Sequence, residues 1–272
     1  MDYESTGNGI IENHFGLHAQ PFPQAADPTA VLHHASLKDA LDRLRFSLDR
    51  DGIAQLSAES GCGKSTVLGC LSRELDQTKY LYIYSSLASV GPFGLIAGLA
   101  GKLSVRVRRS KSQTVSDLIA HLRGLNKRTV IVIDEAHLLP DSSLEDLRLL
   151  TADSLDKKSP FALILAGQPL LRERMNDPLH YALKQRMTVH ARLRPLSEGD
   201  LSLFIDKHMR ACGAIRTLFE LDAIALLFQH SRGIPRLAQG LALNAMLGAV
   251  SAGKKSIDVD CIHQALVDQE AS

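Results

Sequence analysis

Residues 53–66 read Ile-Ala-Gln-Leu-Ser-Ala-Glu-Ser-Gly-Cys-Gly-Lys-Ser-Thr, a short apolar run that leads directly into a glycine-rich turn. Apolar residues then recur at helical spacing, at Val67, Leu68, Leu71 and Leu75. The stretch therefore predicts a strand over 53–57, a loop and a helix in direct succession. Residues 58–65 match the phosphate-binding loop pattern, except that Ala58 stands where the pattern has its first glycine.

Only part of such a loop needs glycine. Gly61 and Gly63 can adopt the backbone conformations that aim consecutive N–H groups at phosphates, Lys64 can reach the β- and γ-phosphate oxygens, and Ser65 can bind Mg²⁺. The alternative is an ordinary glycine turn with a lysine beside it by chance. The residues expected to contact a nucleotide are Ala58, Glu59, Ser60, Gly61, Cys62, Gly63, Lys64, Ser65 and Thr66.

A second polar signal follows the apolar run 129–133, where Asp134 and Glu135 stand side by side. Two carboxylates at the end of a buried strand are costly unless a cation or a reactive water is near. We expect Asp134 to hold Mg²⁺ through water and Glu135 to polarise the attacking water, because side chains diverge along a strand. Taken alone, the pair would also fit a helix-capping turn.

Three further residues are candidates for the same chemistry. Gln168 follows another apolar run and can help to orient the water, although an amide there is also common in plain turns. Arg186 precedes the last short strand and can reach a nucleotide bound to a neighbouring subunit, the alternative being a surface arginine. Arg236 opens a helix, where a cation is unfavourable, and this indicates a nearby anion.

The apolar runs predict the fold class. Runs at 53–57, 80–84, 129–133 and 161–165 alternate with helical patterns, as in a parallel sheet covered on both faces. From about residue 196 only helical patterns remain, with starts indicated by Ser197, Pro235 and Asp258. We therefore predict a three-layer αβα core over 31–195 and an all-helical lid over 196–272. Residues 1–30 form an ordered arm that contributes to the nucleotide pocket.

Composition limits the function further. No apolar run approaches the length of a membrane helix and the polar start cannot serve as a signal peptide, so a cytoplasmic protein without membrane contact is expected. The four cysteines form neither a disulfide framework nor a zinc site, which indicates reduced thiols. A formal net charge of +1 provides no global field toward nucleic acid, so any such binding must come from a local patch.

The ordered series of motifs resembles the ExeA-type AAA+ ATPases, a group similar to the transposition ATPases TniB and TnsC and, more distantly, MuB. The resemblance runs from about Phe15 to Gln269 and includes the loop, the Asp134-Glu-Ala-His-Leu138 run and Gly233-Ile-Pro-Arg236. It implies an AAA+ fold, ATP as cofactor and Mg²⁺-dependent hydrolysis. It also implies roles for single residues: Walker A for Lys64 and Ser65, Walker B for Asp134 and Glu135, sensor 1 near Gln168, the arginine finger for Arg186, sensor 2 for Arg236, and adenine contacts near Phe15 and Leu17.

The resemblance leaves three roles open. In the first, the protein assembles with ATP as a homo-oligomeric ring or filament on double-stranded DNA, independent of sequence, and recruits a transposase or a transposition adaptor. The second is an ATPase of a general secretion system, and the third is a generic AAA+ switch on a protein partner. The run Asp134-Glu-Ala-His137 also spells a helicase motif, but those enzymes need two recombinase-like domains and this chain has room for one.

Two features of the sequence favour the transposition role. Secretion ATPases continue past this domain into a membrane segment, whereas this chain, which we expect to be complete, ends after the lid. In similar ATPases, moreover, the region 105–111 lines a central channel, so a basic patch there could follow the phosphates of a duplex. The alternative is a solvated basic loop. The patch consists of Arg106, Arg108, Arg109 and Lys111.

Overall fold

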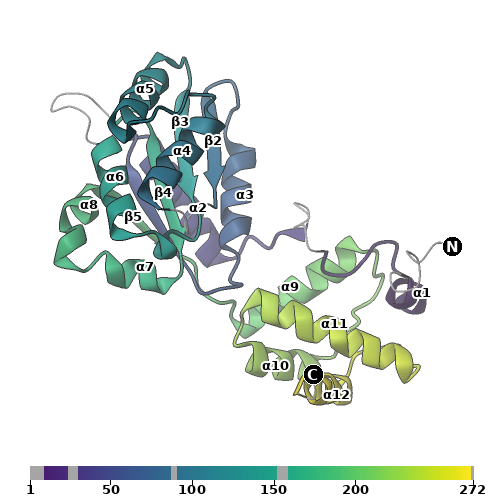
Figure 1. Cartoon of the computed structure of the whole chain (residues 1–272). Helices are drawn as coiled ribbons and strands as arrows, with labels where there is room; N and C mark the ends of the chain where they lie inside the picture. Colours follow the sequence, from purple (N-terminus) through teal and green to yellow (C-terminus); the bar gives the residue numbers. More distant parts are fainter. Residues whose placement is uncertain (1–8, 24–29, 87–90, 152–158, 271–272) are drawn as a thin grey trace. The chain divides into compact units, whose positions relative to one another are not determined.

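The computed structural model describes residues 9–23, 30–86, 91–151 and 159–270. The chain divides into two compact units (Figure 1). The α/β unit comprises Ala35–Ser60 and Val67–Leu193, and the helical unit comprises Met1–His34, Gly61–Thr66 and Arg194–Ser272. Residues 1–8 and 24–29 of the expected arm lie outside the described residues.

The α/β unit is built on a five-stranded sheet whose strands are all parallel. Their order across the sheet is β2-β3-β4-β1-β5, so β4 lies between β1 and β3. The expected parallel α/β fold is confirmed, with strand limits within one or two residues of the apolar runs. The strands are β1 (Ile53–Ser57), β2 (Tyr80–Ser85), β3 (Arg128–Ile133), β4 (Ala162–Gly167) and β5 (Met187–Arg192).

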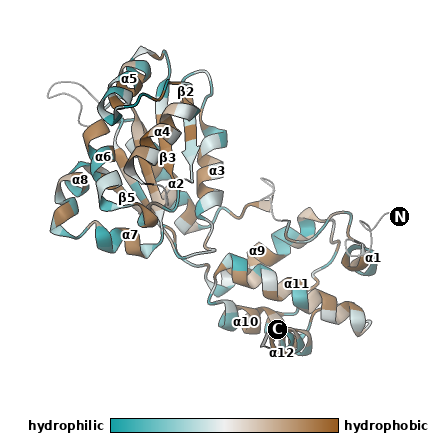
Figure 2. Cartoon of the chain, in the orientation of Figure 1, coloured by the Kyte–Doolittle hydropathy of each residue, from teal (hydrophilic) through white to brown (hydrophobic). Residues whose placement is uncertain are grey.

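Burial explains why these runs form the centre of the unit. Every residue of β1 and β4 is buried, and hydrophobic colouring runs along the central strands in Figure 2. Alternate residues of a strand point to opposite faces, so Ile131 and Ile133 pack into one hydrophobic cluster with residues of α4, α5 and α6. Helix α2 covers the other face with Leu37, Leu41, Leu44 and Leu48. The sheet therefore lies between two helical layers (Figure 1).

The helices of this unit follow the predicted order. One of them, α5, begins at Lys111, and its first turn carries no apolar periodicity. The elements are α2 (Ala35–Leu48), α3 (Lys64–Glu74), α4 (Pro92–Lys102), α5 (Lys111–Gly124), α6 (Asp141–Thr151), α7 (Pro169–Arg174) and α8 (Tyr181–Arg186), with short 3₁₀ turns η2 (Ala136–Leu138) and η3 (Pro178–His180).

The helical unit has its own hydrophobic core. Ser197 accepts a hydrogen bond from the N–H of Asp200, Asp258 accepts one from the N–H of Cys261, and Pro235 occupies the first turn of its helix, so the predicted helix starts are confirmed. The helices are α9 (Glu198–Ala211), α10 (Leu221–Ser231), α11 (Pro235–Ser251) and α12 (Val259–Glu270). Among the described residues, no helix is both long and apolar enough to cross a membrane.

The N-terminal segment contains a helix that the sequence pattern did not predict, α1 (Ile10–Phe15). Six residues are too few to display a helical period, and the helix ends at Gly16, whose φ of 70° lies in the left-handed region. Ile11 and Leu17 belong to the core of the helical unit, and Phe15 and Phe22 pack against it. The described part of the arm is therefore a component of the helical unit.

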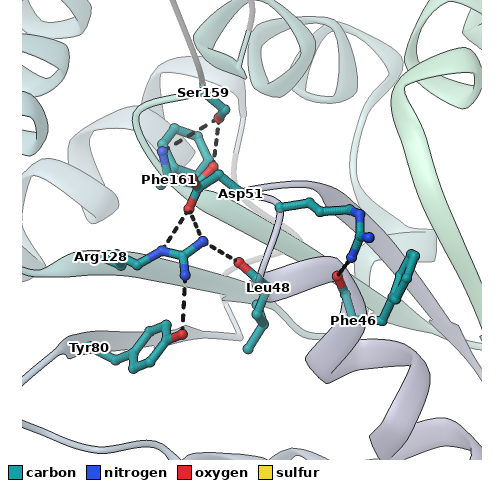
Figure 3. A network of polar contacts seen from close by, with 8 residues as sticks. Phe46, Leu48, Asp51, Tyr80, Arg128, Ser159 and Phe161 are labelled. Atoms are coloured by element: carbon teal, nitrogen blue, oxygen red, sulfur yellow. Dashed lines mark hydrogen bonds and ion pairs between the residues drawn. The ribbon is translucent and has the colours of Figure 1, made fainter.

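A polar clasp joins three segments at the amino-terminal edge of the sheet (Figure 3). The guanidinium of Arg128, in β3, donates to the Asp51 carboxylate at 2.9 Å and to the Leu48 carbonyl at 2.8 Å. It also lies 3.3 Å from the Tyr80 hydroxyl. The clasp therefore ties the turn between α2 and β1 to the start of β3.

A cavity of about 340 Å³ adjoins this clasp and includes Lys127 and Arg128 in its lining. Two of its cationic groups are bonded within the protein: the Lys127 ammonium donates to the carbonyl of Gln77, and the Arg128 guanidinium donates to Asp51. These bonds reduce the positive charge that the cavity can offer to an anionic ligand.

Candidate functional site

The glycine-rich loop has the backbone that the sequence predicts. Gly61 and Gly63 have φ values of 80° and 96°, which only glycine adopts at little cost. The N–H of Ala58 donates to the Gly167 carbonyl at 3.1 Å, and Ala58 is not among the residues with positive φ, so a methyl group is tolerated at this position. Helix α3 begins at Lys64, which leaves the N–H groups of its first turn without partners inside the helix.

Within the helical unit, Arg236 lies against this loop. Its N–H donates to the carbonyl of Gly61 at 3.3 Å. A β-carbon added to Gly61 would come within 2.8 Å of the β-carbon of Arg236, closer than carbon atoms tolerate. Residue 61 therefore must be glycine both for its φ and for its contact with the first turn of α11.

The two acidic residues stand at the carboxyl end of β3. Asp134 is 5% exposed, and both of its carboxylate oxygens are engaged. Oδ1 accepts the N–H of Glu135 at 2.8 Å, and Oδ2 accepts the hydroxyl of Tyr84, at the end of β2, at 2.6 Å. Burial and this hydrogen bond raise the pKa of Tyr84, so the hydroxyl stays protonated and continues to donate. Asp134 is thus held by its neighbours in a fixed orientation.

Glu135 has a left-handed backbone, with φ 53° and ψ 32°. Such a conformation costs a non-glycine residue about 1–3 kcal/mol and persists only where the surroundings enforce it, as they often do at functional sites. The side chain of Glu135 is 41% exposed, in contrast to that of its buried neighbour Asp134. The pair therefore combines one immobilised carboxylate with one that solvent reaches.

Gln168 and the acidic pair lie at the same edge of the sheet. Gln168 directly follows β4, which is paired with β3, and it is the N-cap residue of α7. Its N–H points to Nδ1 of His137 at 3.4 Å, and His137 follows the acidic pair in η2. The ends of β3 and β4 are therefore connected through the His137 ring.

Arg186 lies at the opposite edge. It is exposed at the end of α8, immediately before Met187, which is paired with Ile53 at the start of β1. A six-residue strand spans about 20 Å, so the length of the sheet separates Arg186 from Asp134. The structure does not bring Arg186 to the acidic pair of its own chain.

Two other groups of predicted residues occupy different surroundings. Leu17 is buried in the core of the helical unit, and Phe15 packs at the margin of that core. In the basic patch, Arg108 forms an ion pair with Asp117 at 2.7 Å and Lys111 forms one with Asp146, while Arg106 and Arg109 are exposed. Two of the four predicted DNA-contacting cations are therefore already neutralised by carboxylates.

Tyr84 and His137 are contacts of the acidic pair that the sequence pattern did not indicate as functional. Tyr84 is 50 positions from Asp134, and only the pairing of β2 with β3 brings the two together. His137 falls within the Asp-Glu-Ala-His run, which was the one available signal. In the described part of the chain, no group of three or more His, Cys, Asp or Glu residues is arranged to hold a metal, and the four cysteines are buried and form no disulfide.

Known proteins resemble this chain both in sequence and in fold. Residues 47–175 match the family model described as AAA domain. Solved structures share the fold: Cdc6p from Pyrobaculum aerophilum has a TM-score of 0.69 at 18% identity, covering 94% of this chain and 70% of that one. Drosophila ORC bound to DNA has a TM-score of 0.67 at 17% identity, covering 100% and 69%. The chain has the fold of the AAA P-loop proteins.

A particular relative is the general secretion pathway protein A of Aeromonas hydrophila, which is 33% identical over 251 residues. The match covers 89% of this chain but 45% of that protein. The chain thus spans less than half the length of this curated relative. The match supports similarity to an ExeA-type protein along most of the chain.

Proposed function

We propose that this chain binds and hydrolyses ATP. The observation that carries the proposal is the glycine-rich loop, whose Gly61 and Gly63 have left-handed φ values and which leads into the first turn of α3. The N-terminus of a helix favours phosphate oxygens, because its N–H groups point toward the ligand and its dipole attracts negative charge. The AAA domain match over residues 47–175 supports the same assignment.

In this proposal each polar residue has one task. Lys64 neutralises the β- and γ-phosphates. Glu135 polarises the attacking water, because its carboxylate is exposed to solvent. Gln168 orients that water from the neighbouring strand end, and Arg236 faces the phosphates from the start of α11. Phe15 borders the adenine, whereas the buried position of Leu17 leaves it a supporting role in the core.

The residues also fit a magnesium ion. Ser65 and Asp134 provide hydroxyl and carboxylate oxygens, the hard ligands that Mg²⁺ prefers, and Mg²⁺ commonly takes its remaining ligands from phosphates and water. A dedicated protein cage is therefore not required. When bound, the ion would neutralise charge on the phosphates. The Tyr84 hydroxyl occupies Oδ2 of Asp134 and must share that oxygen or leave it.

Hydrolysis needs a second subunit in this account. Because Arg186 lies at the opposite edge of the sheet from Asp134, it serves a nucleotide bound to a neighbouring copy. We therefore propose a homo-oligomer, either a ring or a filament, in which each nucleotide is completed by the Arg186 of the next chain.

Steady-state ATP hydrolysis tests the proposal. Lys64→Ala is expected to reduce ATP binding and abolish turnover, because the phosphates lose their cation. Lys79→Ala, at an exposed lysine paired with Asp76, is the matched control and should hydrolyse ATP as the unaltered protein does. Turnover by Lys64→Ala at the unaltered rate, or no turnover by the unaltered protein, would contradict the assignment.

The partner of the ATPase is a separate proposal. The relative at 33% identity is named for general secretion, which favours a switch that acts on a protein partner, as in the secretion alternative. The energy difference between ATP-bound and ADP-bound assemblies would drive that partner on or off. Since the chain spans 45% of that relative, the role of the whole relative is only an indication.

A second candidate is duplex DNA, with recruitment of a transposase or transposition adaptor as the finer version. The observation that favours it is the exposure of Arg106 and Arg109 between α4 and α5. Because two of the four cations of the patch are already paired with carboxylates, we expect weak binding with a shallow salt dependence. In a plot of the logarithm of the binding constant against the logarithm of the salt concentration, the slope steepens by about one unit per neutralised phosphate.

Gel-shift assays with random-sequence duplex at low salt, with and without a non-hydrolysable ATP analogue, distinguish the two candidates. DNA binding that requires nucleotide and is lost in the Arg106→Ala/Arg109→Ala double variant supports the second. Arg43→Ala, at an exposed arginine paired with Asp39, is the control. No nucleotide-dependent shift would remove the DNA candidate and the transposition role with it.

A further inference from the structure

His137 occupies a buried position between the two strand ends of the proposed ATPase site. It is 7% exposed and belongs to η2, two residues after Glu135. Its carbonyl accepts a hydrogen bond from Arg174 at 2.7 Å, and Arg174 also bonds the Leu139 carbonyl and the carboxylate of Asp141. The backbone of His137 is therefore anchored to α7 and to the start of α6.

The ring of His137 has little room to move. A β-carbon on Gly167 would lie 3.1 Å from the backbone nitrogen of His137 and 3.3 Å from its Nδ1. The last residue of β4 therefore packs directly on the ring. A larger side chain at position 167 would displace the ring from the strand end.

One ring atom faces two partners. Nδ1 lies 3.4 Å from the backbone nitrogen of Gln168 and 3.6 Å from Oε2 of Glu135. A bare Nδ1 can accept the N–H of Gln168 but offers nothing to a carboxylate, whereas an Nδ1 that carries hydrogen can donate to Glu135 but cannot accept from Gln168. The two neutral tautomers of histidine therefore favour one neighbour each. A small rotation of the exposed Glu135 side chain would close the second contact to hydrogen-bonding distance.

We propose that His137 is a positioning residue that couples Glu135 to the β4–α7 corner bearing Gln168. It sets the direction of the Glu135 carboxylate relative to the amide that orients the water, without touching nucleotide itself. The inference rests on the proposed ATPase function and concerns the hydrolysis step. Binding of ATP, which depends on the loop and Lys64, is independent of His137.

Three variants of the full chain test this inference. His137→Leu removes Nδ1 and is expected to lower kcat for ATP about 10-fold, the effect of one lost hydrogen bond to a charged group, while KM and the Kd for ATP change less than about 2-fold. His137→Asn places an amide near the position of Nδ1, can both accept and donate, and should restore kcat to within about 3-fold of the unaltered value. His180→Leu is the structural control.

His180 is also buried and bonds Asp141 at 3.0 Å, in the same polar network but away from Glu135. His180→Leu should lower Tm as much as His137→Leu does, yet keep kcat. The inference is overturned if His137→Leu keeps kcat, if kcat falls equally in both Leu variants, or if His137→Asn folds but does not restore it. No ATP turnover by the unaltered protein would instead refute the proposed function, and the inference with it.

Discussion

Tyr84 determines the availability of Asp134 at the scale of single residues. Its hydroxyl donates to Oδ2 at 2.6 Å, and the N–H of Glu135 occupies Oδ1, so a buried carboxylate that we assign to Mg²⁺ already has both oxygens bonded. Such bonds compensate the cost of burying the charge when the ion is not bound. The same bonds must be shared or given up when Mg²⁺ arrives.

Removal of the hydroxyl should therefore favour the metal. For Tyr84→Phe we expect the Mg²⁺ concentration at half-maximal ATP turnover to fall about 3- to 10-fold, as for one hydrogen bond of about 1 kcal/mol that no longer competes. Titration of ATP turnover with Mg²⁺ measures this value. Tyr82→Phe is the matched control, because the Tyr82 hydroxyl donates to the Leu68 carbonyl and not to Asp134. A higher Mg²⁺ requirement in Tyr84→Phe would show that the hydroxyl orients Asp134 for the metal.

The clasp at the amino-terminal edge of the sheet connects separate elements of the fold. Arg128 connects β3 to the turn that joins α2 to β1, and Asp51 in that turn has a left-handed φ of 51°. The clasp is partly exposed, since the Arg128 side chain is 39% accessible. Solvent screening therefore reduces the energy of its ion pair.

We expect Arg128→Met to lower the free energy of unfolding by about 1–2 kcal/mol, from the lost bonds to Asp51 and the Leu48 carbonyl. Urea denaturation followed by circular dichroism measures the change. ATP turnover should be unaffected, because the clasp and the acidic pair lie at opposite edges of the sheet. Lys127→Met, which removes a neighbouring exposed cation, is the control. If Arg128→Met unfolds at the same urea concentration as the unaltered protein, the proposed role of the clasp is contradicted.

The elements that sequence reasoning predicted well are those whose signal is local. Residues 130–133 are apolar without interruption because both faces of the strand are buried, and β3 extends this run by Thr129 and Arg128. The loop glycines were predictable because phosphate binding and left-handed φ both require them at fixed spacing. Helix α1 was missed because it is shorter than two turns.

The parts of the site that could not be predicted depend on which strands become neighbours. Tyr84 meets Asp134, and His137 meets Gln168, only after β2, β3 and β4 align in register. The ion pairs of the basic patch also depend on contacts that the sequence does not show. Its charges were visible in the sequence, but the carboxylates Asp117 and Asp146 that pair with Arg108 and Lys111 were not.

In the proposed oligomer, Arg186 of one chain completes the nucleotide site of the next chain. Arg186→Ala should lose at least about 100-fold in ATP turnover while retaining ATP binding, because an arginine finger acts on the transition state of a neighbour's nucleotide. Lys184→Ala, at another cation of α8, is the control and should remain active.

Mixing two inactive variants tests whether the finger acts between subunits. Arg186→Ala retains an intact loop and Lys64→Ala retains Arg186, so random mixing at equal amounts should restore about a quarter of the full turnover. The absence of any recovery, in a mixture shown to oligomerise together, would contradict completion of the site by a second chain.

We propose that ATP is hydrolysed at the carboxyl edge of the sheet and that Glu135 activates the attacking water. The most direct measurement is a single-turnover comparison of Glu135→Gln with the unaltered protein, with ATP binding followed in the same samples. We expect Glu135→Gln to bind ATP with unaltered affinity, to accumulate as an ATP-bound oligomer and to hydrolyse the nucleotide at least about 100-fold more slowly. Hydrolysis at the unaltered rate would contradict this proposal.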